Sequence, residues 1–139
     1  MIILDTNVLS ALMRERPDQE VVRWLNEQPR TSVWTTSITV FEIRFGIRIL
    51  AAGKKQQLLN EAFNQLIDGL IERRIADFDG SAAQEAADLM AARQKKGLSG
   101  ELRDTMIAGI AMARHATLAT RNTRPFEGAS FAVVNPWSS

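Results

Sequence analysis

Short runs of apolar residues alternate with longer stretches of helical periodicity along this chain. The apolar runs are rich in β-branched side chains and predict strands at 1–4, 32–36, 75–79, 117–120 and 131–134. Apolar residues that recur at three- and four-residue spacing predict helices over 8–13, 21–28, 38–50, 54–71, 82–93 and 101–113. Strands that alternate with helices predict one three-layer α/β/α domain over residues 1–139, with a mainly parallel central sheet.

The first predicted strand ends in a carboxylate. Met1 to Leu4 is continuously apolar, as in a central parallel strand covered on both faces, and Asp5 follows it directly. Ligands of open α/β sheets bind at the carboxyl ends of the strands, so Asp5 lies where a site is expected. The alternative is that Asp5 only caps the helix that follows, by accepting hydrogen bonds from its first N–H groups. This stretch alone leaves both interpretations open.

A second acid, Glu42, interrupts the apolar side of a predicted helix. We expect Phe41, Ile43 and Phe45 to crowd Glu42, and a carboxylate beside buried surface requires a partner or a metal ion. The spacing from Thr39 to Glu42 also matches a capping box, in which the Glu accepts a hydrogen bond from the backbone of the cap residue. Glu42 is therefore either a site residue or a helix cap.

Asp104 and Asn122 complete a set of oxygen ligands. Asp104 lies in the first turn of the last predicted helix, where the helix dipole alone would favour an acid. Asn122 follows the strand at 117–120, in the same kind of position as Asp5, although Asn is also a common turn residue. With Asp5 and Glu42 they suit Mg²⁺ or Mn²⁺, and three converging acids without a cation would repel one another.

Composition excludes several other chemistries. The chain has no cysteine, so thiolate metal sites and cysteine nucleophiles are excluded, and a reducing cytoplasm suits it. Its net charge of +1 is too small for the protein as a whole to be attracted to nucleic acid. We expect neither a signal peptide nor a membrane span, since no apolar run approaches the ~20 residues of a spanning helix. No glycine-rich phosphate loop follows the first strand, which argues against the common nucleotide-binding folds.

Four segments in order resemble PIN-domain ribonucleases, the VapC- and FitB-like toxins of bacterial toxin–antitoxin pairs. These segments are Ile3-Leu4-Asp5-Thr6-Asn7, residues 37–46 around Glu42, Asp104-Thr105-Met106-Ile107-Ala108, and Ala119-Thr120-Arg121-Asn122. The resemblance implies an α/β/α fold and a Mg²⁺- or Mn²⁺-dependent endoribonuclease that cleaves RNA with metal-activated water. It also implies a homodimer and a small cognate antitoxin.

The resemblance assigns roles to the four candidate residues. It implies that Asp5, Glu42 and Asp104 are metal ligands and catalytic residues, with Asn122 as the fourth catalytic position. The commonest family pattern has Asp at that fourth position. Asn122 keeps one carbonyl acceptor but lacks the charge, so a second metal would be held weakly or not at all.

Other functions remain open at this point. The acids of a non-catalytic module would form a groove for a basic segment of a partner, and the same scaffold would also suit a metal-dependent phosphatase or DNA nuclease. In the ribonuclease hypothesis, we expect Arg44 and Arg121 to position the RNA backbone and the hydroxyls of Thr6 and Thr120 to lie near the metal. The apolar helical hairpin at 38–71 predicts self-association.

Overall fold

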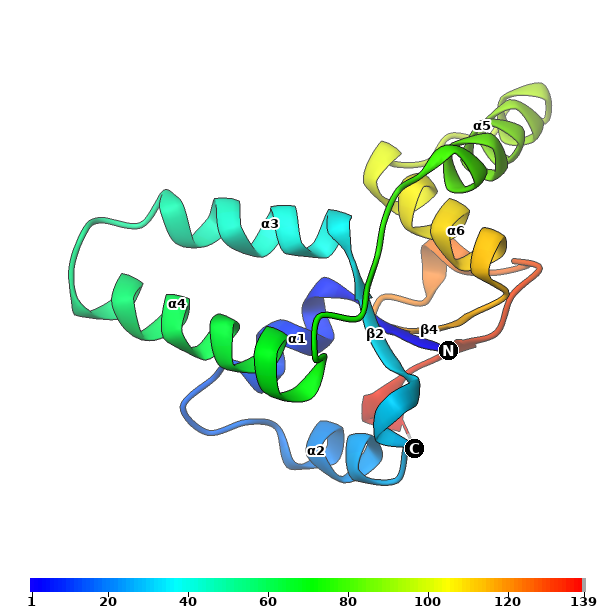
Figure 1. The fold of residues 1–139 in the computed structure, drawn as a ribbon. Coiled ribbons are helices and arrows are strands. Elements are labelled where there is room, and N and C mark those ends of the chain that lie inside the picture. Colours follow the sequence, from blue (N-terminus) through cyan, green and yellow to red (C-terminus); the bar gives the residue numbers. More distant parts are fainter. Residues whose placement is uncertain (139) are drawn as a thin grey trace.

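A parallel sheet lies between two groups of helices in the computed structural model, which describes residues 1–138 (Figure 1). The sheet has five strands in the order β3-β2-β1-β4-β5, and every pairing is parallel. The strands are β1 (Ile2–Leu4), β2 (Val33–Thr36), β3 (Ile75–Ala76), β4 (Thr117–Ala119) and β5 (Val133–Val134). Parallel strands place all their carboxyl ends at one edge, and β1 is at the centre of that edge.

One face of the sheet is covered by the helices of the first half of the chain. They are α1 (Thr6–Leu12), α2 (Gln19–Asn26), α3 (Ser37–Arg48) and α4 (Lys54–Gln65), with a π-helical turn at Leu66–Leu70 and a 3₁₀ turn at Arg30–Ser32. Leu4 of β1 and Ala119 of β4 face this side and pack with Phe63 and Ile43 in one apolar core.

The opposite face is covered by α5 (Gly80–Lys95) and α6 (Leu102–Arg114). Ile3 and Leu118, the neighbours of Leu4 and Ala119, pack with Ile107 and Ile110 in a second core. Short 3₁₀ turns at Arg124–Phe126 and Pro136–Ser138 flank β5. The predicted three-layer α/β/α architecture with a parallel sheet is therefore confirmed (Figure 1).

The element boundaries differ from the prediction where side chains bond to the backbone. The strand predicted over 75–79 ends at Ala76, because Asp79 accepts a hydrogen bond from Ala82 N and caps α5. The helix predicted over 54–71 changes to π-helical hydrogen bonding at Leu66, and Ile71 N donates to the carbonyl of Leu66. None of the helices in residues 1–138 is long and apolar enough to cross a membrane.

The two helices of the second face approach closely at Gly109 of α6. A methyl group at this position would lie 2.5 Å from the carbonyl oxygen of Ala82 and 2.8 Å from the Cβ of Ala86, both on α5. Gly109 is buried, so no solvent-exposed space relieves this contact. The close approach therefore fixes α6 against α5 and, with it, the side chains that α6 carries to the edge of the sheet.

We expect Gly109→Ala to destabilise the protein by about 1–3 kcal/mol, because an added methyl group overpacks the α5–α6 contact. The matched control is Gly46→Ala in α3, where an added methyl group meets no atom within 4 Å among residues 1–138 apart from its chain neighbours and the nearby backbone of its own helix. This control should raise stability by about 0.5–1 kcal/mol, since alanine favours a helix over glycine. Urea unfolding of the two variants measures both effects, and equal stabilities would contradict the packing argument.

Candidate active site

Asp5 both caps a helix and presents its carboxylate to the sheet edge. Its backbone N–H donates to the carbonyl of Ala119 at 3.0 Å, which extends the β1–β4 ladder to the strand end. Its side chain, only 1% exposed, accepts from Thr6 N at 2.8 Å through Oδ1 and from the Thr120 hydroxyl at 2.9 Å through Oδ2. The cap and the site are therefore two uses of one carboxylate rather than alternatives.

Glu42 reaches the same edge from α3. The capping-box interpretation of Glu42 is wrong, because Thr36 caps α3 and accepts the hydrogen bond from Thr39 N at 3.1 Å. Glu42 instead accepts from the Thr6 hydroxyl at 2.8 Å. The expected crowding by aromatic rings is also wrong, since Phe41 and Phe45 are 68% and 56% exposed.

The first turn of α6 brings Asp104 and Arg103 to these acids. The Arg103 guanidinium lies among all three carboxylates: Nη2 donates to Asp5 Oδ1, Nε to Glu42 Oε1 at 2.9 Å, and Nη1 to Asp104 Oδ1 at 2.9 Å. Nη2 also donates to the Thr6 hydroxyl at 2.9 Å. One arginine therefore joins residues from the end of β1, from α3 and from α6.

The charges of this cluster stabilise one another. Burial alone would lower the pKa of Arg103, but its hydrogen bonds with Glu42, Asp5 and Asp104 and the negative charge of Asp5 hold that pKa well above its ordinary value. The guanidinium is therefore charged at neutral pH. It supplies the cation that three neighbouring acids require.

The donor set is of the kind that a hard divalent cation takes. Asp5, Glu42 and Asp104 offer only carboxylate oxygens, the ligands that Mg²⁺ and Mn²⁺ prefer. As the side chains lie, no three acidic or imidazole groups within residues 1–138 are close enough together to hold a metal ion. The guanidinium of Arg103 lies between the carboxylate oxygens of Asp5, Glu42 and Asp104. A metal ion bound by these oxygens would therefore take the place of the guanidinium.

Asn122 lies beside the three acids rather than among them. Its backbone N–H donates to the Thr120 hydroxyl at 3.2 Å, and this hydroxyl in turn donates to Asp5. Its side chain is exposed and lines a groove that also contains Asp104, Arg93 and Arg124. The role of Asn122 as the fourth site residue stays a prediction.

The two arginines expected to position RNA have other contacts. Arg44 donates to Asn60 and Asn64 of α4 and lies 4.6 Å from the ring centre of Phe63, so it belongs to the α3–α4 contact. Arg121 lies over the ring of Trp137 at 4.9 Å. The groove beside Asp104 is lined by Arg124 and by Arg93, whose Nη2 donates to the carbonyl of Pro125 at 3.1 Å, and also by Glu101 and Glu127.

Arg103 is the site residue that sequence reasoning missed. It precedes Asp104 directly, and nothing in its immediate sequence distinguishes it from a solvated arginine on a helix surface. The signal that would have found it is the requirement of three converging acids for a counter-charge.

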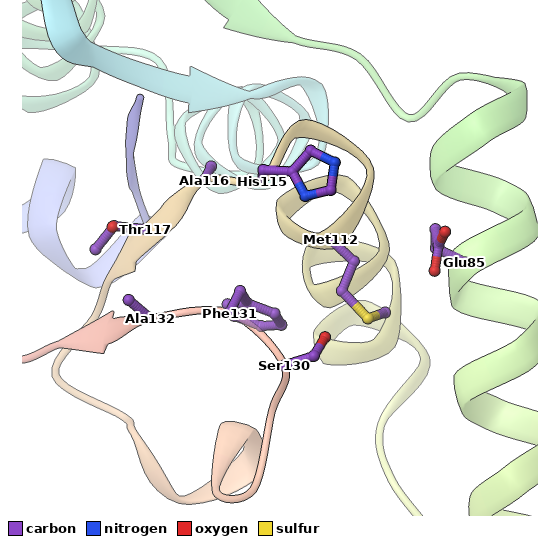
Figure 2. Close-up of a pocket in the computed structure, with 8 residues that line it drawn as sticks. All are labelled: Glu85, Met112, His115, Ala116, Thr117, Ser130, Phe131 and Ala132. Carbon is purple, nitrogen blue, oxygen red and sulfur yellow. The ribbon is translucent and has the colours of Figure 1, made fainter.

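A second pocket lies at the opposite end of β4 and α6 (Figure 2). Its lining comes from α5, α6, the start of β4 and the segment before β5, as Glu85, Met112, His115, Ala116, Thr117, Ser130, Phe131 and Ala132. His115 ends α6 in a left-handed conformation with φ of 51°. Since Asp104 lies in the first turn of α6 and His115 caps its last turn, this pocket is remote from the acids.

A parallel α/β/α fold, here with three acids near the carboxyl end of its central strand, agrees with the resemblance of the sequence to PIN domains. Residues 2–132 match the PIN domain family, and the chain belongs to that family.

Two relatives and one solved structure cover nearly all of the chain. VapC ribonuclease Y4jK of Sinorhizobium fredii is 36% identical, over 99% of this chain and 98% of its own. Toxin FitB of Neisseria gonorrhoeae is 39% identical, over 99% of each chain. The crystal structure of FitAcB from Neisseria gonorrhoeae superposes with a TM-score of 0.89 at 38% identity and covers both chains completely.

We expect Thr120→Val to destabilise the protein by about 1–3 kcal/mol, because it removes the buried hydroxyl that bonds Asp5, Asn7 and the Asn122 backbone. The control is Thr117→Val at the other end of β4, whose hydroxyl bonds to no atom of residues 1–138 and whose replacement should change stability by less than about 0.5 kcal/mol. Thermal unfolding measures both. A Thr120→Val protein as stable as the control would show that this hydroxyl does not support the site.

Proposed function

We propose that this PIN-domain protein is an endoribonuclease toxin of a toxin–antitoxin pair and cleaves RNA with Mg²⁺ or Mn²⁺. The observation that carries the proposal is that Asp5, Glu42 and Asp104 converge on the guanidinium of Arg103 at the carboxyl edge of the sheet. A relative named as a VapC ribonuclease and another named as a toxin support the RNA substrate and the toxin role.

Asp5 and Asp104 are the principal ligands in this proposal, because they are the two most buried acids of the cluster, with side chains 1% and 10% exposed. Glu42, at 30% exposed, completes or orients the metal shell. Asn122 contributes at most a neutral oxygen, which favours one metal over two.

A bound divalent cation supplies Lewis acidity that polarises the scissile phosphate and activates water for attack. The chain supplies the positions of the reacting groups. Thr6 N and the Thr120 hydroxyl fix the Asp5 carboxylate in one orientation, since each bonds a different oxygen. Arg93 and Arg124, which line the groove beside Asp104, are placed to bind RNA phosphates. Phosphate contacts of this kind set the register of the strand without reading its sequence.

We further propose an antitoxin partner and a homodimer. Apolar side chains of α3 and of the residue that follows it are exposed, namely Phe41, Phe45 and Ile49, with exposed fractions from 56% to 68%. A groove between the end of α1 and α4 is lined by apolar residues together with Lys54 and Lys55. The first surface suits a second copy of the chain, and the groove suits an apolar antitoxin segment with acidic residues. The lack of cysteine fits action in the cytoplasm.

We expect Asp5→Asn to reduce RNA cleavage at least about a hundredfold, because the amide keeps the helix cap but removes the ligand charge. The measurement is cleavage of labelled RNA with Mg²⁺, Mn²⁺ or EDTA, and EDTA should abolish cleavage by the wild type. Asp77→Asn, which changes an exposed acid outside the cluster, is the matched control and should cleave normally.

The same assay separates the other functions. Parallel reactions with DNA and with a phosphomonoester test for a DNA nuclease and a phosphatase. Cleavage of RNA that persists in EDTA, or in a folded Asp5→Asn protein, would reject the metal-dependent mechanism. No cleavage of any substrate by the wild type would favour a non-catalytic module.

A further inference from the structure

Arg103 makes all its side-chain hydrogen bonds to the candidate metal site. Within residues 1–138, its guanidinium bonds only the carboxylates of Asp5, Glu42 and Asp104 and the hydroxyl of Thr6. It makes no hydrogen bond there to a backbone carbonyl, so the acids alone hold this end of the side chain. Arg103 therefore depends on the same groups that a metal ion would use.

The two oxygens of Asp5 illustrate the overlap. A carboxylate has about four lone-pair positions. Thr6 N occupies one on Oδ1 and the Thr120 hydroxyl occupies one on Oδ2, and both donors belong to the framework of the sheet edge. Nη2 of Arg103 takes the remaining position on Oδ1, and Nη1 faces the remaining position on Oδ2 at 3.5 Å. A cation that binds Asp5 would therefore enter space that the guanidinium now occupies.

Glu42 and Asp104 repeat this relation. Oε1 of Glu42 already accepts from the Thr6 hydroxyl at 2.8 Å, and Nε of Arg103 bonds both oxygens of that carboxylate. Asp104 accepts from Nη1 at 2.9 Å. Every acid of the proposed site thus gives at least one oxygen to the guanidinium.

We propose that Arg103 is an exchangeable counter-cation of this site, so that its guanidinium and a divalent metal ion compete for the same three carboxylates. The proposal rests on the proposed function, because it concerns the metal site assigned there. In the metal-free protein, Arg103 prevents the repulsion of three acids that are partly or wholly buried. When a metal binds, the guanidinium leaves, and the metal must displace it.

The position of Arg103 allows this exchange. Its side chain is 26% exposed and lies in the first turn of α6, next to Leu102, which is 61% exposed. Rotation of the side chain therefore moves the guanidinium into solvent without displacement of α6. The displaced group then lies near the metal and beside the groove of Arg93 and Arg124, where an RNA phosphate would bind.

The test is calorimetric titration of the metal-free protein with Mn²⁺. We expect Arg103→Gln to bind Mn²⁺ at least about tenfold more tightly than the wild type. The metal no longer has to break the charge-assisted hydrogen bonds of a competing guanidinium, and the free energy of one such bond corresponds to about a tenfold change in Kd. The metal-free variant should melt at a lower temperature, and Mn²⁺ should raise its melting temperature more than that of the wild type. Arg103→Lys, with one compact charge that cannot bond three acids at once, should give an intermediate Kd.

Arg114→Gln is the matched control, since it removes the same charge from the other end of α6, where Arg114 faces Asp79. Its Kd for Mn²⁺ should equal that of the wild type. An Arg103→Gln protein that binds Mn²⁺ no more tightly than the wild type would overturn the competition while leaving the proposed function intact. If Arg103→Gln does not fold, a Kd for Arg103→Lys equal to that of the wild type overturns it. The absence of Mn²⁺ binding by every protein would instead reject the metal site and the proposed function together.

Discussion

The cluster of Asp5, Glu42 and Asp104 depends on a cation between them. Three carboxylates from the end of β1, from α3 and from α6 would repel one another at the edge of one sheet, and the guanidinium of Arg103 compensates this repulsion. Removal of one partner from such a cluster leaves buried charge without compensation, which is strongly destabilising. The presence of a cation is therefore a structural requirement of this cluster.

The fold brings these groups together through its parallel sheet. All carboxyl strand ends lie at one edge, β1 is central, and α3 follows directly from β2 at that edge. Close packing at Gly109 fixes α6 on α5, so that the first turn of α6 reaches the same edge from the second face. Two apolar cores hold the sheet from both sides, and the polar groups gather where neither core extends.

The sequence was sufficient for the fold class, because strand and helix periodicities differ and their alternation leads to a parallel sheet. It also pointed to Asp5, since an acid after a buried strand has a fixed place in such a sheet. For Glu42 the sequence left two roles open, and only the structure shows that Thr36 is the cap of α3. The expected crowding of Glu42 failed because local sequence does not reveal which face of α3 is covered, and Phe41 and Phe45 lie on the uncovered one.

Arg103 could not be predicted from its neighbours in the chain. Its role arises from its contacts with Glu42 and Asp5, which precede it in the sequence by 61 and 98 positions. The local sequence pattern also does not predict the change to π-helical bonding at Leu66. This change depends on the hydrogen bond that Ile71 N donates to the carbonyl of Leu66. The fold class thus follows from periodicity, whereas the role of Arg103 follows from the pairing of charges that are distant in the sequence.

The central claim is that the carboxylates of β1, α3 and α6 form one divalent-cation site, and a crystal structure grown in Mn²⁺ tests it most directly. The account predicts an anomalous scattering peak within about 2.3 Å of oxygens of Asp5 and Asp104, with the guanidinium of Arg103 withdrawn from both. A structure at saturating Mn²⁺ with no peak between these carboxylates, and with Arg103 still bonded to all three, would contradict it.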